Sequence, residues 1–134
     1  MALRPNLSKW HVLIVDDDAP SAEVEADLLR VFKANVYVAL SGSSALAMLA
    51  ALPKLTTIVM DLKMPEMSGW QLLKQIRNMP DYSEVPIVAV TACAMPGDRE
   101  HSLATGFDGY IAKPVNLIPF WWELGEIIVQ KHSV

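Results

Sequence analysis

Residues 57–65 read TIVMDLKMP, and the run TTIVM at residues 56–60 is apolar and rich in β-branched side chains. Such a run, ended by the charge of Asp61 and then by Pro65, is typical of a short buried strand. In open α/β sheets, ligands bind at the carboxyl ends of the strands, where Asp61 would lie. A buried carboxylate is costly unless it is paired or binds a metal, so we expect other charged groups beside it. A carboxylate that merely caps the following loop is the alternative interpretation.

Four further apolar runs of similar length occur along the chain, at residues 10–15, 36–40, 85–90 and 109–112. A helical pattern follows each of the five runs. These helices are expected from Ala19 to before Asn35, over 44–52, from Gly69 to before Asn78, from about Asp98 to Gly106, and from a cap at Asn116 to about Gln130. The alternation predicts an α/β fold, a doubly wound five-stranded parallel sheet with helices on both faces.

Two helices carry informative apolar spacing. In the first, Val24, Leu28, Val31 and Phe32 recur at helical intervals. In the last, a core-facing stripe is expected from Leu117, Phe120, Trp121, Leu124 and Ile128. A second apolar stripe, rotated by about 100°, comprises Ile118, Trp122, Gly125 and Val129. Because a helix on one sheet face buries one stripe, the second is a candidate interface; a deeply embedded helix is the alternative.

Composition limits the classes of protein that the chain can represent. Its 134 residues, 52% hydrophobic and 19% charged, predict one globular domain over 1–134, with its core at about 10–130 and no separate output module. The net charge of −4, without a basic stripe, argues against direct nucleic-acid binding. Cys93 is the single cysteine, so no intrachain disulfide is expected and the cytoplasm is the expected compartment. No apolar run is long enough to predict membrane insertion.

Polar side chains follow four of the predicted strands. Asp16 and Asp17 come after the first, Asp61 after the third, Thr91 after the fourth and Lys113 after the fifth. Because parallel strands lie about 4.8 Å apart and end at one edge, these side chains should converge. Three carboxylates so close repel one another unless a cation lies among them, and oxygen ligands of this kind suit Mg²⁺.

This set of groups fits phosphoryl transfer to a carboxylate. A carboxylate can act as the nucleophile and form an acyl phosphate, and catalysis then depends mainly on positioning and on neutralising the phosphoryl oxygens. Mg²⁺, Lys113 and the Thr91 hydroxyl would supply that neutralisation. Each residue alone has an ordinary interpretation as a loop acid, a strand residue or a surface charge. Their joint placement at successive strand ends favours the functional one.

Four stretches carry a resemblance to a known family. They read IVDD at 14–17, VMDLKMPEMSG at 59–69, VTA at 90–92 and YIAKP at 110–114. Together they resemble the receiver domain of two-component response regulators, and the likeness covers about residues 10–130.

The resemblance implies a fold, a phosphorelay role and a set of site residues. The sheet order would be 2-1-3-4-5. Asp61 would accept phosphate from the histidine of a sensor histidine kinase or a histidine phosphotransfer protein. Asp16, Asp17 and Asp61 would bind Mg²⁺ with the Lys63 backbone carbonyl. Thr91 and Lys113 would contact the phosphoryl group, and Tyr110 would turn inward as Thr91 moves, switching a face for a downstream protein or a homodimer. The domain would be regulatory rather than an enzyme, beyond self-catalysed transfer and autodephosphorylation.

Departures from the family pattern are modest. Asp18 adds a third acid to the first motif, and Ser43-Ser44 stands where an acidic residue often precedes the helix. Cys93 lies two residues after Thr91, and Lys63 two residues after Asp61. Side chains at these positions can lean over a phosphoryl group and obstruct water, so we expect them to tune its lifetime.

Two other α/β classes remain as alternatives. A haloacid-dehalogenase-like phosphatase also uses an aspartate nucleophile with Mg²⁺, but it has a second aspartate two residues later, where this chain has Lys63. A flavodoxin-like cofactor binder needs a phosphate-binding loop after the first strand, and Asp16, Asp17 and Asp18 would repel phosphate there.

Overall fold

The computed structural model describes residues 6–92, 95–113, 115 and 117–132, and residues 117–119 and 132 by their backbone alone. In these described residues five strands alternate with five α-helices, and a short 3₁₀ turn precedes the fourth strand. In order, the elements are β1 (His11–Val15), α1 (Ala19–Arg30), β2 (Asn35–Ala39), α2 (Gly42–Leu49), β3 (Thr57–Met60), α3 (Gly69–Arg77), the 3₁₀ turn Pro80–Tyr82, β4 (Ile87–Thr91), α4 (Asp98–Thr105), β5 (Gly109–Ala112) and α5 (Leu117–His132).

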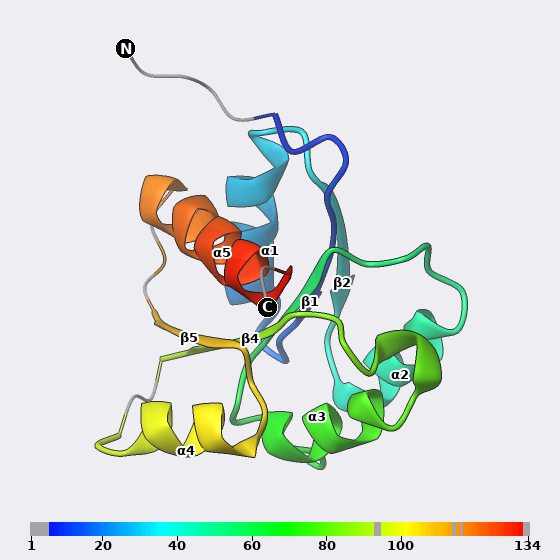
Figure 1. Ribbon diagram of the computed structural model, residues 1–134, viewed down its shortest axis with the longest axis vertical. Helices are drawn as coiled ribbons and strands as arrows, with labels where there is room; N and C mark the ends of the chain where they lie inside the picture. The colour runs from blue at the N-terminus through cyan, green and yellow to red at the C-terminus, as the bar shows by residue number, and fades with distance from the viewer. Residues whose placement is uncertain (1–5, 93–94, 114, 116, 133–134) are drawn as a thin grey trace.

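The sheet is parallel, in the order β2-β1-β3-β4-β5, which confirms the predicted fold. Helices α1 and α5 cover one face of the sheet, and α2, α3 and α4 lie on the other (Figure 1). Two apolar clusters fill the spaces between the layers. One contains Leu72, Leu73 and Ile76 of α3, and the other contains Leu29 of α1 and Phe120 of α5. Strands β3 and β4 are buried along their whole length, as their uninterrupted apolar sequence requires.

The apolar side chains at helical spacing coincide only partly with the packed face of α1, because Leu28 packs against the core and Val24 does not. The buried positions are Ala22, Glu25, Ala26 and Leu29. Val24 and Val31, by contrast, are each 53% exposed. The small alanine side chains allow α1 to lie close to the sheet, which the larger valines would prevent. The helix ends at Arg30, earlier than predicted, and Lys33 takes a left-handed backbone conformation with φ 77°. Phe32 is therefore buried as a residue of the turn that follows the helix, not as a residue of α1.

Of the predicted core-facing stripe of α5, Phe120 and Leu124 are buried, Trp121 and Ile128 are half-buried, and the Leu117 side chain lies outside the described residues. Part of the second stripe is exposed. Phe120 and Leu124 are fully buried, whereas Trp122 is 56% and Val129 66% exposed. Ile127 also packs against the core, because Gly109 has no side chain to occupy its place. The side chain of Ile118 lies outside the described residues, as does Asn116, the predicted cap. Within the described part of the chain, no helix combines the length and apolarity needed to cross a membrane.

Candidate phosphorylation site

The last hydrogen bonds of the sheet bring the predicted residues to one edge. The backbone N–H of Asp61 donates to the carbonyl of Val15 at 2.9 Å, next to Asp16. The backbone N–H of Lys113 likewise donates to the carbonyl of Thr91 at 2.9 Å. Since parallel neighbours end side by side, the strand ends themselves assemble the site.

Three carboxylates form a cluster at this edge. One oxygen each from Asp16, Asp17 and Asp61 lies within 4.8 Å of the others. Asp16 is buried and Asp17 is exposed, so the cluster opens to solvent on one side. Three carboxylate oxygens at such distances are a donor set that fits Mg²⁺, which takes oxygen ligands and keeps several waters.

Lys113 provides the positive charge beside the cluster. Its Nζ donates to Asp16 Oδ2 at 2.7 Å and lies 3.8 Å from Asp61 Oδ2. Burial alone would lower the pKa of Lys113, but the hydrogen bond and charge of Asp16, helped by Asp61, outweigh it and raise the pKa. The ammonium therefore stays charged within reach of Asp61.

The Asp61 carboxyl lies partly buried between these groups. Burial raises its pKa, and the Lys113 charge opposes that rise. The backbone N–H of Lys63 donates to Asp61 Oδ1 at 3.4 Å, while Lys63 itself is exposed. A carboxylate oriented by the loop that follows it is suited to attack a group arriving from solvent.

The loop after Asp61 approaches its own strand closely at Gly69. A Cβ atom at Gly69 would overlap the Asp61 carbonyl and lie 2.9 Å from Leu62 Cα. The Gly69 N–H donates to the carbonyl of Leu62 at 2.8 Å, and a capping box between Ser68 and Gln71 starts α3 there. The absence of a side chain at residue 69 thus lets the start of α3 lie directly against the backbone of Asp61 and Leu62.

The third acid of the first motif has a different role from its neighbours. Asp18 caps α1, because its Oδ2 accepts from the backbone N–H of Ser21 at 3.0 Å. Its own N–H donates to Asp16 Oδ1 at 2.9 Å. Asp18 therefore orients Asp16, and the described cluster contains three acids rather than four.

Thr91 and Tyr110 occupy the expected strand positions, and Tyr110 is half-buried against the core. Thr91 is buried at the end of β4. The Tyr110 hydroxyl is covered and has no hydrogen-bond partner among the described residues. The predicted movement of Tyr110 on phosphorylation stays a prediction. Cys93 lies outside the described residues.

Sequence reasoning missed one acid of the site, Glu25. It is 2% exposed on the packed face of α1, and its Oε2 lies 3.9 Å from Lys113 Nζ. Burial raises the pKa of its carboxyl to about 8, although Lys113 opposes this. Its helical spacing from Ala22, Ala26 and Leu29 is the one signal in the sequence that points to it, and small alanines make that signal weak.

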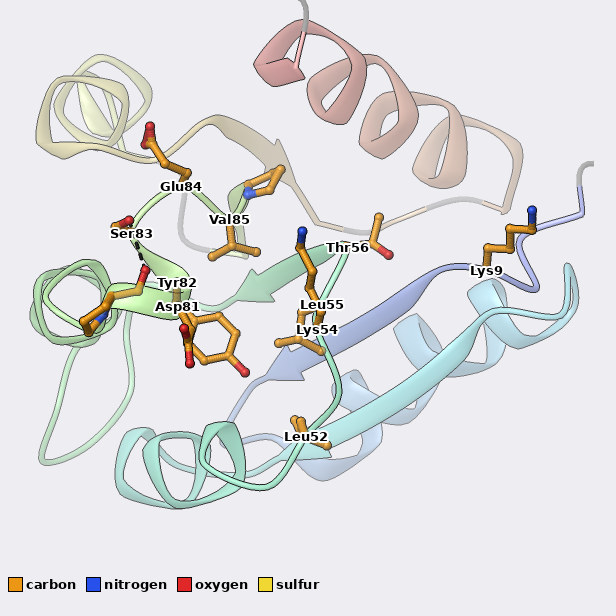
Figure 2. A pocket seen from close by; sticks show the side chains of 12 residues that line it. Lys9, Leu52, Lys54, Leu55, Thr56, Asp81, Tyr82, Ser83, Glu84 and Val85 are labelled. Atoms are coloured by element: carbon orange, nitrogen blue, oxygen red, sulfur yellow. Dashed lines mark hydrogen bonds between the residues drawn. The ribbon is translucent and has the colours of Figure 1, made fainter.

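A hollow of about 820 Å³ lies at the opposite edge of the sheet (Figure 2). Loops before β3 and β4 line it, with Leu55, Thr56, Tyr82 and Val85 among its residues. It shares no residue with the acidic cluster. The candidate chemistry therefore belongs to the carboxyl-terminal edge.

Comparison with known proteins gives a consistent result. The family model described as the response regulator receiver domain matches residues 12–119. The chain is 38% identical over 111 residues to an uncharacterized 14.6 kDa protein of Leptolyngbya boryana, covering 82% of this chain and 83% of that one. It is 33% identical over 105 residues to the rice two-component response regulator ORR11, covering 78% and 71% of the two chains.

A solved structure resembles the fold closely. The receiver domain of the Pseudomonas aeruginosa sensor histidine kinase PA1611, described with a magnesium ion in its active site cleft, superposes with a TM-score of 0.80. The two sequences are 29% identical, and the match covers 90% of this chain and 98% of that one. These likenesses give no support to the dehalogenase-like phosphatase alternative. From its sequence motifs, its sheet order and these matches, the chain belongs to the response regulator receiver domain family.

Proposed function

We propose that Asp61 accepts a phosphoryl group from the phosphohistidine of a sensor histidine kinase or a histidine phosphotransfer protein. One observation carries the proposal. Three carboxylates lie within 4.8 Å of one another, and Lys113 Nζ lies 3.8 Å from Asp61. Such a group of anions around a nucleophile, with a cation at hand, fits transfer of a charged phosphoryl group.

The transfer is a single displacement at phosphorus. An Asp61 carboxylate oxygen forms a P–O bond while the P–N bond to the donor histidine breaks, and the electron pair leaves on the imidazole nitrogen. Lys113 stabilises the charge on the phosphoryl oxygens, because its ammonium is already held beside Asp61. The Thr91 hydroxyl, at the end of the adjacent strand, would donate to the same oxygens.

Asp16, Asp17 and Asp61 would hold Mg²⁺, together with the Lys63 backbone carbonyl. The ion supplies charge neutralisation for the phosphoryl oxygens. The carboxylate donor set supports this assignment, as does the magnesium described in the PA1611 receiver domain.

We further propose that residues 10–130 act as one regulatory receiver domain in the cytoplasm. Its own chemistry would be limited to self-catalysed phosphotransfer and autodephosphorylation. Output would pass to a downstream protein, or to a second copy of the chain, over the face of α4, β5 and α5. The exposed Trp122 and Val129 of α5 support this choice. The net charge of −4 favours a protein over nucleic acid as the target.

Intact-mass measurement after incubation with acetyl phosphate tests the proposal. We expect the mass to rise by one phosphoryl group when Mg²⁺ is present and to stay unchanged when a chelator is added. Asp61→Asn should abolish the gain. Asp27→Asn, which changes an exposed aspartate on α1, should preserve it. An unmodified wild-type protein in the presence of Mg²⁺ would contradict the proposed function.

A further inference from the structure

Glu25 is a buried acid at the site that the proposed phosphoryl transfer does not use. It comes from α1, and its Oε2 is covered without a hydrogen-bond partner among the described residues. Glu25 and Lys113 also line a small cavity of about 360 Å³ between α1 and the segments after β4 and β5. An unpartnered buried oxygen is costly, and an apolar side chain of similar size would avoid that cost. Its position beside Lys113 suggests a role.

Lys113 lies among three carboxyl groups at different distances. Its Nζ is 2.7 Å from Asp16, 3.8 Å from Asp61 and 3.9 Å from Glu25. An ammonium has three N–H donors, and Asp16 alone is at hydrogen-bonding distance. Lys113 therefore makes one hydrogen bond, to Asp16, and a small movement would bring its ammonium within hydrogen-bonding distance of Asp61 or Glu25.

The three acids differ in their relation to the cation cluster. Asp16 and Asp61 contribute oxygens to that cluster, whereas Glu25 does not. A divalent cation held by Asp16 and Asp61 would compete for the same two carboxylates and repel the ammonium. Ser21 hydrogen-bonds the Glu25 carboxyl, but Oε2 has no hydrogen-bond partner among the described residues, so of the three acids Glu25 alone keeps a carboxyl oxygen available to Lys113.

We propose that Glu25 is a positioning residue, whose carboxyl oxygen keeps the Lys113 ammonium beside Asp61 when Asp16 and Asp61 bind a cation. The inference rests on the proposed function, because the place of Lys113 matters to the reaction only if Asp61 takes up a phosphoryl group. Glu25 touches neither the phosphoryl group nor the cation in this account. It acts through Lys113.

The protonation state of the Glu25 carboxyl indicates which kind of interaction it makes with Lys113. Burial raises the pKa of its carboxyl to about 8, so near neutral pH the group is mainly protonated. The contact then depends on an acceptor oxygen rather than on a full negative charge. Glutamine has the same shape and a carbonyl oxygen, so it should replace Glu25. Leucine and alanine offer no acceptor and should not.

The experiment observes Lys113 directly, before any phosphorylation. The Cε and Nζ signals of Lys113 are followed by NMR in protein with isotope-labelled lysine, with and without Mg²⁺, and are assigned by their loss in Lys113→Arg. In the wild type and in Glu25→Gln, the signals should remain distinct from those of exposed lysines after Mg²⁺ is added. In Glu25→Leu and Glu25→Ala, Mg²⁺ should move them toward the exposed-lysine positions. Glu23→Gln, an exposed position on the same helix, is the matched control.

A second measurement connects this position to the reaction. The rate of phosphorylation by acetyl phosphate should fall by roughly threefold to tenfold in Glu25→Leu and Glu25→Ala, and by less than about twofold in Glu25→Gln. If either variant without an acceptor keeps both the Lys113 signals and the rate of the wild type, the inference is wrong. An equal loss in Glu25→Gln would also overturn it. A wild-type protein that is never phosphorylated refutes the proposed function instead, whatever the Lys113 signals show.

Discussion

At the scale of single residues, the buried Glu25 carboxyl makes the stability of the folded protein depend on pH. Its pKa is about 8 in the folded protein and 4.5 in the ordinary exposed state, so the folded protein binds this proton more tightly than the unfolded chain. The stability that it contributes is therefore fully present below about pH 4.5 and is lost as the pH rises through about 8. Asp61, whose pKa is also raised, changes stability in the same direction.

We predict that Glu25→Gln flattens this dependence. Between about pH 5 and pH 8 the wild type should lose more unfolding free energy than the variant, by an amount on the order of a few kcal/mol. Urea unfolding at both pH values measures the difference, and the contribution of Asp61 largely cancels between the two proteins. Glu23→Gln should follow the wild type. Parallel profiles for the wild type and Glu25→Gln would show that the Glu25 carboxyl is not protonated on folding.

Lys63 and Cys93 are predicted to tune the lifetime of the phosphoryl group. Lys63 is exposed beside Asp61, where its chain can obstruct or orient the attacking water. Replacing both residues by alanine should change the autodephosphorylation rate by about twofold or more, which corresponds to about 0.4 kcal/mol in the barrier. The decay of the phosphorylated mass after removal of the donor gives the rate. Lys54→Ala, an exposed lysine at the opposite edge, should have no effect, and an unchanged rate in the double variant removes the proposal.

At the scale of elements, the loop from Asp61 to α3 is fixed by a close backbone approach. We predict that Gly69→Ala destabilises the protein by about 1–3 kcal/mol, because its Cβ would overlap the Asp61 carbonyl and the backbone must shift. Gly125→Ala is the matched control. No atom lies within 4 Å of a Cβ there, and alanine favours the helix by about 0.5–1 kcal/mol. Thermal unfolding separates the two cases, and equal effects would contradict the packing described at Gly69.

Helices α3 and α4 and strand β5 each carry one buried polar group that has no partner in the described part of the chain. Trp70 Nε1, Ser102 Oγ and the Tyr110 hydroxyl are buried and unpaired among the described residues. Each such group costs about 1–3 kcal/mol, so a conformation that pairs them would gain stability from these hydrogen bonds. These groups are candidates for the switch that phosphorylation of Asp61 would drive.

Thr91→Ala tests this coupling. The variant should still be phosphorylated on Asp61, but the change in the Tyr110 ring signals on phosphorylation should be reduced, because Thr91 is the group expected to move toward the phosphoryl oxygens. NMR of ring-labelled tyrosine measures the response. Should the full Tyr110 response persist without the Thr91 hydroxyl, the proposed link between these two residues is wrong.

Elements differ in how well the sequence predicts them. Strands β3 and β4 are continuous apolar runs, and their ends place Asp61 and Thr91 directly. The packed face of α1 was not predicted, because its small alanines carry less hydrophobic signal than Val24 and Val31, which are exposed. Glu25 was missed for the same reason. A buried acid is recognisable from a tertiary contact such as that with Lys113, which local spacing does not reveal.

Over the whole molecule, the two ends of the parallel strands carry different groups of residues. The acidic cluster and Lys113 lie at the carboxyl ends of the strands, and the larger hollow lies at the other end, among uncharged and charged loop residues. The exposed apolar side chains of α5 lie on a third surface, away from the packed stripe of Phe120 and Leu124. Phosphorylation and output can therefore use different parts of one small domain.

We predict that Trp122→Ala weakens association without affecting phosphorylation. Trp122 is 56% exposed, so its removal leaves the core intact and takes away an aromatic anchor from the output face. Sedimentation velocity of the phosphorylated protein, over a range of concentrations, should show a weaker dimer by about tenfold or more. Val31→Ala, at a similarly exposed apolar residue just after α1, is the control. A wild type that stays monomeric would exclude the homodimer, and unchanged association in Trp122→Ala would place the contact elsewhere.

The position of the phosphoryl group is the most direct test of the account. After incubation with acetyl phosphate and Mg²⁺, borohydride reduction converts a phosphorylated aspartate to homoserine, and peptide mass spectrometry identifies the residue. We predict homoserine at position 61, and none there when Mg²⁺ is chelated. Modification at Asp16 or Asp17 with Asp61 left intact would contradict the assignment of the acceptor.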